Sequence, residues 1–238
     1  MKHKHFLLVA LSLLFCFANH WALATVLTNV VLGNPPAQNG SFSYDTSNDT
    51  YTVSGTGQLL YADSAGFGDL AYTAITGNFD VSAQITSYSG SGWAGLMALN
   101  GLSSQDAFAA SLLSLADPYG PGYSYAQTYD GTVFSGTTAS ASSPWLRLTR
   151  IGDTLTEYTS TNGSTWTFTN SQSIPMASSV NVGLFVNSAD QTTVDSATFA
   201  NVSGFPAPVP APDSLALMIL AVLALGIIRR NSESLPRL

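Results

Sequence analysis

The sequence predicts an all-β protein, an antiparallel β-sandwich or jelly roll. In the middle of the chain, apolar residues recur at every second position, which is the period of a half-buried strand and not of a helix. Pairs such as Asp130-Gly131, Gly152-Asp153 and Asn162-Gly163 separate these runs, as expected of turns between short strands. The region is also rich in Ser, Thr, Gly, Asn and Tyr, a composition typical of extracellular β-proteins.

The N-terminus, residues 1–24, has the pattern of a secretory signal peptide. Lys2 and Lys4 precede a short apolar helix over residues 6–17, and residues 22–24 form an A-x-A cleavage site. The alternative is an uncleaved anchor. In the favoured interpretation the signal peptide is cleaved after residue 24, and the mature chain begins at Thr25.

The predicted β-sandwich domain covers residues 25–205, and several of its strands are read directly from the alternation. Residues 106–118 have a period that also fits a helix, but their neighbours are strands, so a buried strand and a turn are predicted. Asn162-Gly163 is predicted to be a two-residue hairpin turn. The clearest alternating runs are residues 81–86, 146–149 and 180–187.

The C-terminal end predicts a Pro-rich linker over residues 206–213 and a hydrophobic helix with a basic tail over residues 214–238. The apolar part, residues 214–228, spans roughly 22 Å as a helix, which is short for a bilayer core of about 30 Å. Arg229 and Arg230 follow it, so the positive-inside rule places them in the cytoplasm and the preceding body outside. The membrane is thus an expected partner through this helix.

Composition excludes several function classes for the mature body. His3, His5, His20 and Cys16 all lie in the signal peptide, which leaves no residues for a Ser-His-Asp triad, a thiol nucleophile, a His-ligated zinc or a disulfide. The body carries twelve acidic residues against Arg147 and Arg150, a net charge of −10, which argues against binding to nucleic acid. No cofactor and no metal are predicted. Asp45, Asp49 and Asp130 have the oxygen ligands that Ca²⁺ prefers, but their spacing matches no defined loop.

The candidate ligand-binding residues are Tyr123, Tyr125, Gln127 and Tyr129, which project from one face of a predicted strand. Aromatic rings lie flat against the apolar faces of sugars, and Gln bonds their hydroxyl groups. The alternative is that these tyrosines fill a half-buried face. Trp93 and Trp145 are expected in the core because each would bury a large apolar area.

No catalytic residue is predicted. A glycosidase needs two carboxyl groups, and Glu157 is the only Glu of the mature body. With Gly152-Asp153 as the turn, Leu148 faces Glu157, and Arg150 lies diagonally on the same side. We therefore expect a structural Arg150–Glu157 pair.

The C-terminal arrangement resembles the bacterial PEP-CTERM sorting signal, which an exosortase is thought to recognise and cut. Its tetrad corresponds here to Val209, Pro210, Ala211 and Pro212, and Arg229 and Arg230 match its basic cluster. The resemblance implies an exosortase-type sorting enzyme as a partner. Ala211 stands where the family has Glu, so the tail is either cut by a variant enzyme or retained as an anchor. A eukaryotic lipid-anchor signal fits less well, because such tails end apolar.

Four successive segments resemble a concanavalin A-like lectin/glucanase jelly-roll domain of the DUF1349 type. They are residues 40–57, 79–99, 145–167 and 181–203, and residues 145–167 are the most specific of them. Such domains occur in bacterial surface proteins and beside glycosidases, and no single catalytic motif accompanies them. The resemblance implies the fold and an extracellular placement.

Together these observations predict an exported, cell-surface or membrane-anchored, non-catalytic β-sandwich protein with a candidate role in binding polysaccharide. Two alternatives stay open: a structural component of an extracellular matrix without a small ligand, and a glycosidase-like enzyme.

Overall fold

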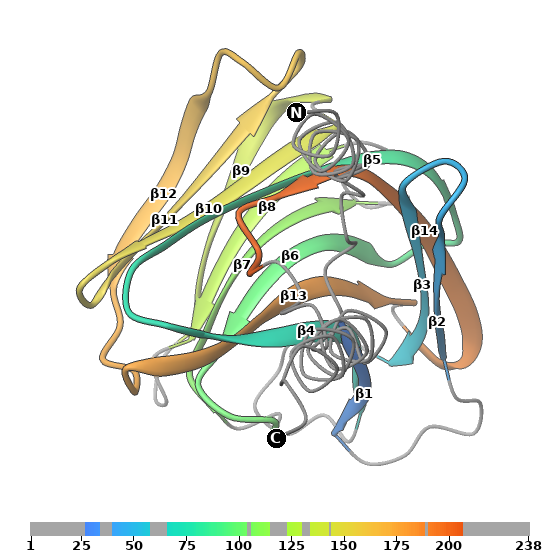
Figure 1. The fold of residues 1–238 in the computed structure, drawn as a ribbon, viewed down its shortest axis with the longest axis horizontal. Coiled ribbons are helices and arrows are strands. Elements are labelled where there is room, and N and C mark those ends of the chain that lie inside the picture. Colours follow the sequence, from blue (N-terminus) through green and yellow to red (C-terminus); the bar gives the residue numbers. More distant parts are fainter. Residues whose placement is uncertain are drawn as a thin grey trace, which may run out of the picture. The chain divides into compact units, whose positions relative to one another are not determined.

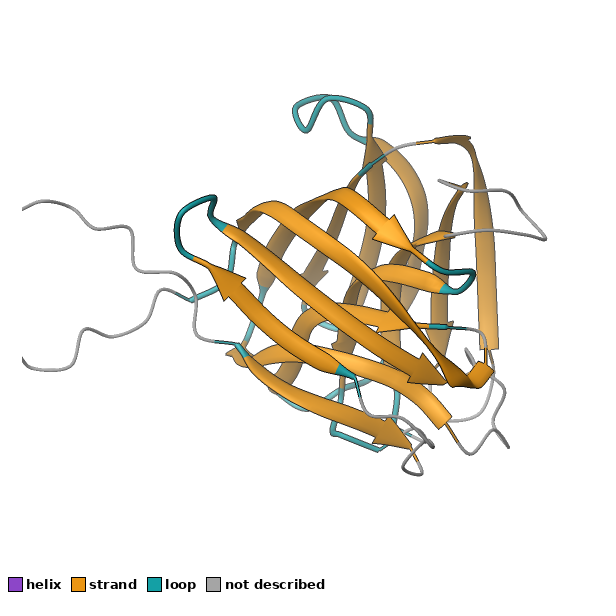
Figure 2. Cartoon of the chain, turned by 90° about the vertical axis from the view of Figure 1, so that its right-hand side faces the viewer, coloured by secondary structure: helices purple, strands orange, loops and turns teal. Residues whose placement is uncertain are grey.

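The structure is a computed structural model, and it describes residues 27–33, 40–57, 66–103, 106–114, 123–129, 134–142, 144–188 and 190–206. The predicted signal helix, the Pro-rich linker and the C-terminal hydrophobic helix lie outside these residues. Every regular element of the described part is a β-strand (Figure 2). The described ranges contain no helical segment with the length and hydropathy of a membrane span.

Two antiparallel sheets of seven strands each form a sandwich, which confirms the predicted fold class (Figure 1). Sheet A contains, in spatial order, β1 (Thr28–Gly33), β4 (Gly66–Thr76), β13 (Ser179–Asn187), β6 (Trp93–Leu99), β7 (Phe108–Ser114), β8 (Tyr123–Tyr129) and β9 (Phe134–Ser142). Sheet B contains β12 (Thr167–Ser173), β11 (Thr154–Ser160), β10 (Trp145–Ile151), β5 (Phe79–Ser89), β14 (Asp190–Ser203), β3 (Thr50–Gly57) and β2 (Ser41–Asp45).

The alternation predicted from sequence sets the core between the sheets. Val81, Leu148 and Val182 are fully buried there, while the residues between them in each strand face away from the partner sheet. Residues 106–118 contain the strand β7, as predicted. The Gly152-Asp153 hairpin is also confirmed, because Ile151 pairs with Thr154 across it.

Strands β4, β13, β6 and β7 of sheet A carry buried apolar side chains on both faces, whereas the sequence predicted one buried face. On β6, Leu96 and Ala98 belong to the core between the sheets, whereas Met97 and Leu99 belong to a second cluster on the opposite face. We refer to this second set as the outer cluster; its buried members are Leu32, Leu70, Met97, Leu99, Phe108, Ala110, Leu112, Tyr129 and Phe185. Most outward side chains of sheet B are instead polar or aromatic, and many of them are accessible; Ile151, which is 72% exposed, is an exception.

Candidate functional site

The outer face of sheet B carries a group of aromatic side chains around one arginine. On β10, Leu146 and Leu148 point into the core, so Trp145 and Arg147 point outward. Arg147 pairs in register with Tyr158 of β11 on one side and with Ser82 of β5 on the other. The strand order therefore brings residues that are distant in sequence to one surface.

Arg147 is held in place by a carboxylate and two rings. Its Nε and Nη2 donate to the two oxygens of Asp80 at 2.7 and 2.5 Å, a bidentate pair. Its guanidinium carbon lies 5.2 Å from the centre of the Tyr158 ring and 5.5 Å from that of Trp166, within cation–π range. The hydrogen bond to Asp80 raises the pKa of Arg147 further above its ordinary value.

Phe168 and Trp145 complete this surface. The Phe168 ring meets Tyr158 edge-on at 6.3 Å and is itself 60% exposed, so it is available for contact with a ligand. Trp145 is half-buried on the same face of β10. We call this group the Arg147 patch; its residues are Asp80, Trp145, Arg147, Tyr158, Trp166 and Phe168.

The loop between β11 and β12 shapes one side of the patch. Asn162 Oδ1 accepts hydrogen bonds from the backbone N–H groups of Ser164 and Thr165, both at 2.9 Å. Gly163, with φ of 72°, lies against Trp145: a Cβ there would come within 2.8 Å of the indole ring. The prediction of a two-residue turn at Asn162-Gly163 was wrong, because the loop extends to Trp166 and packs on Trp145.

Trp145 also differs from the prediction, since it lies on the outer face of sheet B and not in the core. The reason is its phase on β10: Leu146 and Leu148 take the inward positions, so the odd-numbered residues must face outward. Trp93 is half-buried against the outer cluster of sheet A.

The predicted tyrosine row lies on the other sheet. In β8, positions 125, 127 and 129 pair with Leu112, Ala110 and Phe108, three members of the outer cluster. Tyr129 is 6% exposed, and its ring lies 6.0 Å from that of Phe108. The structure describes only the backbone of residues 123–128, so sugar binding by Tyr123, Tyr125 and Gln127 stays a prediction.

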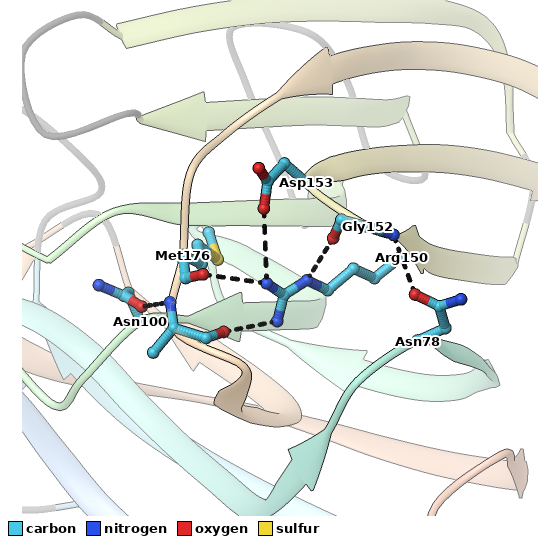
Figure 3. Close-up of polar contacts among 7 residues, drawn as sticks. Asn78, Asn100, Arg150, Gly152, Asp153 and Met176 are labelled. Carbon is cyan, nitrogen blue, oxygen red and sulfur yellow. Dashed lines mark hydrogen bonds and ion pairs between the residues drawn. The ribbon is translucent and has the colours of Figure 1, made fainter.

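Arg150 does not pair with Glu157, and this prediction was wrong. The expected register is present, with Leu148 opposite Glu157. Arg150 instead turns toward the end of the sheet, where its guanidinium donates to the carbonyl oxygens of Gly152, Ala177 and Met176 at 2.8, 2.9 and 3.1 Å (Figure 3). Arg150 lies near the end of β10, where backbone carbonyl groups are available to it. Glu157 lies further inside, between the two sheets.

Glu157 is fully buried between the sheets. Neither of its carboxyl oxygens has a hydrogen-bond partner among the described residues. Burial raises the pKa of Glu157 from 4.5 to about 8, because a charged carboxylate loses its hydration there. The carboxyl group is therefore mostly protonated at neutral pH.

Two more buried carboxyl groups shift in the same direction. Burial raises the pKa of Asp69 to about 6 and also raises that of Asp195. The loss of hydration of Asp195 is partly compensated by hydrogen bonds. Its Oδ2 accepts from the backbone N–H groups of Ser91 and Gly92, both at 2.7 Å. Because the pKa values of Asp69 and Asp195 are raised in the fold, both groups should make the stability of the domain depend on pH.

The acids considered for Ca²⁺ serve other purposes where they are described. Asp45 accepts from the backbone N–H of Ser47 at 2.8 Å, and Asp49 accepts from the Tyr44 hydroxyl at 2.8 Å, which raises the pKa of Tyr44 to about 12. Asp130 lies outside the described residues. Within the described ranges, no three His, Cys, Asp or Glu side chains gather as a metal site would require.

The sorting residues Val209, Pro210, Pro212, Arg229 and Arg230 lie outside the described residues as well. Sequence reasoning missed the Arg147 patch, although one signal was available. The phase of Leu146 and Leu148 places Arg147 outward and Arg150 inward, so Arg147 is the basic side chain that the body presents to solvent, within a segment rich in aromatic residues.

Fold and surface together define an antiparallel two-sheet β-sandwich with an exposed aromatic patch. By sequence, the chain matches no protein-family model and no curated protein. By structure, it is similar to a functionally unknown protein from Saccharomyces cerevisiae, with a TM-score of 0.56, 18% identity, and coverage of 77% of this chain and 97% of that one. This similarity shows the fold alone.

Two further solved structures are similar at lower scores. A prokaryotic β-1,3-1,4-glucanase (lichenase) from a mouse hindgut metagenome has a TM-score of 0.46 and 8% identity, covering 77% of this chain and 94% of that one. The carbohydrate-binding module CBM66 from Bacillus subtilis has a TM-score of 0.45 and 14% identity, covering 77% and 97%.

Proposed function

We propose that this chain is an exported protein, retained at the cell envelope by its C-terminal segment, whose β-sandwich binds neutral polysaccharide at the Arg147 patch. The observation that carries the proposal is the exposed ring of Phe168 beside an arginine fixed by Asp80, Tyr158 and Trp166. A hydrophobic ring next to oriented polar groups suits a sugar, which has an apolar face and hydroxyl groups at its rim.

Sheet B is the favoured side because its aromatic side chains are accessible. The described members of the outer cluster on sheet A are buried, including Tyr129. Tyr72 and Trp93, which pack against that cluster, are half-buried, as Trp166 is on sheet B, but Phe168 of sheet B is 60% exposed. A soluble polymer reaches the rings of sheet B without rearrangement of the domain.

A neutral ligand fits the charge of this surface. Arg147 is already paired with Asp80, and the body as a whole carries a net charge of −10, which repels acidic polymers. Binding through ring contacts and hydrogen bonds should therefore be weak, on the order of millimolar to micromolar, and nearly independent of salt.

The position of Glu157 supports the non-catalytic part of this proposal. Hydrolysis of a glycosidic bond requires two carboxyl groups that reach the bond. Glu157 has no exposed surface and faces the space between the sheets, away from the Arg147 patch. We therefore assign binding, and not cleavage, to this domain.

Replacing the aromatic side chains of the patch tests this proposal. We expect Trp166→Ala to weaken binding to soluble neutral β-glucan or xylan by about tenfold or more, equivalent to about 1.4 kcal/mol, because a contact ring is lost. Affinity electrophoresis measures the binding, and thermal melts show that the fold is intact. Tyr88→Ala is the matched control, since Tyr88 is an exposed aromatic residue of sheet B outside the patch.

The same experiment includes the tyrosine row. Tyr125→Ala could abolish binding without lowering the melting temperature, while Trp166→Ala leaves binding unchanged. In that case the ligand binds sheet A, and the assignment to the Arg147 patch is wrong.

Removing the C-terminal segment tests the envelope assignment. Truncation after Phe205 should release a soluble protein, because the apolar run that ends at Arg229 and Arg230 is then absent. Membrane sedimentation of both forms measures the effect. Equal pelleting of the truncated and full chains would show that the segment is not the anchor.

A further inference from the structure

We propose that the ligand is a long polysaccharide chain that crosses sheet B diagonally, from the Arg147 patch to two rows of hydroxyl groups on β5, β14, β3 and β2. This inference rests on the proposed function and adds the class of ligand: an extended polymer, and not a chain end or a short oligosaccharide.

The hydroxyl rows follow from strand register. Tyr51, Val53, Ala197 and Phe199 point into the core, so the residues between them point outward. Strand pairing then aligns these outward positions across four strands. One row is Ser41, Ser54, Ser196 and Ser89, and the other is Ser43, Thr52, Thr198 and Ser87.

These hydroxyl groups are ordered by their neighbours. Ser54 Oγ donates to Ser196 Oγ at 3.1 Å, and the hydroxyl oxygens of Thr52 and Thr198 lie 3.4 Å apart. Each hydroxyl group has one donor and two acceptor sites, so such a pair keeps capacity for a further partner. All eight side chains of the rows are short and uncharged, which suits a neutral polymer lying flat.

Polar side chains connect the rows to the Arg147 patch. Gln84 pairs in register with Trp145 and accepts a hydrogen bond from Asn201 Nδ2 at 2.8 Å. Ser82, which pairs with Arg147, lies 2.9 Å from the hydroxyl oxygen of Ser203. The polar surface is thus continuous from β10 across β5 to β14.

The length of the path from the Arg147 patch to the hydroxyl rows indicates the class of ligand. From Arg147 to Ser43 the path crosses four strand spacings of about 4.8 Å and about five residues of roughly 3.3 Å along the strands, so the diagonal is on the order of 25 Å. A disaccharide is much shorter than this path, whereas an extended polymer covers it. Contacts at both ends then act on one ligand molecule.

The test compares the full chain with a double variant, Ser54→Ala with Thr198→Val, which removes hydroxyl groups from both rows. The probes are β-glucan and xylan fractions that range from disaccharide to long polymer. We expect the double variant to bind the polymer about tenfold more weakly and to bind short oligosaccharides as the unmodified chain does. Ser178→Ala with Ser179→Ala, at exposed positions of sheet A and the turn before it, is the control.

The outcomes separate this inference from the proposed function. If the double variant binds every fraction as the unmodified chain does, while Trp166→Ala still weakens binding, the hydroxyl rows are not a binding surface and the patch alone holds the ligand. If Trp166→Ala also has no effect, or no fraction binds at all, both ideas are wrong. Loss of polymer binding in the control pair as well would also overturn the inference.

Discussion

Glu157→Gln should stabilise the domain at alkaline pH and leave it unchanged near pH 5. Glu157 has an ordinary pKa of 4.5 when unfolded and a pKa of about 8 in the fold. Between these values the folded chain holds a proton that the unfolded chain has lost. The stability that this proton contributes is fully present below the unfolded pKa and is lost as the pH rises through about 8.

The effect is expected to be large because Glu157 is fully buried without a hydrogen-bond partner among the described residues. The pKa difference corresponds to a loss on the order of 3–5 kcal/mol between pH 5 and pH 9. Gln has the shape of the protonated acid and cannot ionise, so the variant lacks this loss. Asp69 and Asp195 add residual dependence in the same direction.

Urea unfolding at several pH values between 5 and 9 measures this difference. This range avoids Asp45 and Asp190, whose pKa values are lowered to about 2 and which therefore act only in stronger acid. Asp153→Asn is the control, because Asp153 lies in the turn of the same hairpin, is 60% exposed, and makes a long ion pair of 4.0 Å with Arg150. An unchanged slope of stability against pH in Glu157→Gln would show that Glu157 is ionised or partnered in the fold.

Arg150→Ala should destabilise the domain by about 3–5 kcal/mol, since it removes three hydrogen bonds that one buried, charged side chain donates, each worth about 1.5 kcal/mol. Arg150 joins the β10–β11 turn to the segment before β13 through the carbonyl oxygens of Gly152, Met176 and Ala177 (Figure 3). Two side-chain amides support the same region: Asn78 accepts from Gly152 N–H, and Asn100 accepts from Ala177 N–H.

Arg150→Lys should recover only a small part of this loss, because an ammonium group lacks the planar fork that reaches three carbonyl groups at once. Arg147→Ala is the comparison, and we expect it to cost about 0–1 kcal/mol because its ion pair is exposed. Urea unfolding measures all three variants. A cost for Arg150→Ala no greater than that for Arg147→Ala would contradict the role given to Arg150.

The sequence was sufficient to predict the sandwich because side-chain alternation reports directly on burial. The inward phase of Val81, Leu148 and Val182 is visible in the sequence and is present in the structure. The same alternation predicted that Leu148 faces Glu157. The register between the two strands of one hairpin depends on residues that are close in sequence, so it can be predicted from that stretch alone.

The Arg150–Glu157 pair failed because facing positions do not determine where a long side chain ends. Arg150 reaches carbonyl groups contributed by residues 176 and 177, which are distant in sequence. The sequence drew attention to Glu157 as the only Glu of the mature body. Its burial without a hydrogen-bond partner among the described residues, however, depends on the opposite sheet. Neither fact is visible within the hairpin.

The Arg147 patch was missed in part because Asp80 comes from a strand whose adjacency to β10 is set by the whole sheet, whereas Arg147 and Tyr158 face each other within one hairpin. Asp80 lies on β5, and Tyr158 and Phe168 lie on β11 and β12. Sequence analysis placed Trp145 in the core on the basis of its size. The phase of Leu146 and Leu148 already placed Trp145 outward, and this signal could have been used.

The central claim is that polysaccharide binds the outer face of sheet B, and the tryptophan indole N–H signals test it most directly. Trp145 and Trp166 lie at the Arg147 patch, whereas Trp93 lies on sheet A beside the outer cluster. With each signal assigned by single replacement, titration of the purified chain with neutral β-glucan or xylan should shift the Trp145 and Trp166 resonances and leave that of Trp93 in place. A shift of Trp93 alone, or no shift of any indole signal at saturating polymer, would contradict the account.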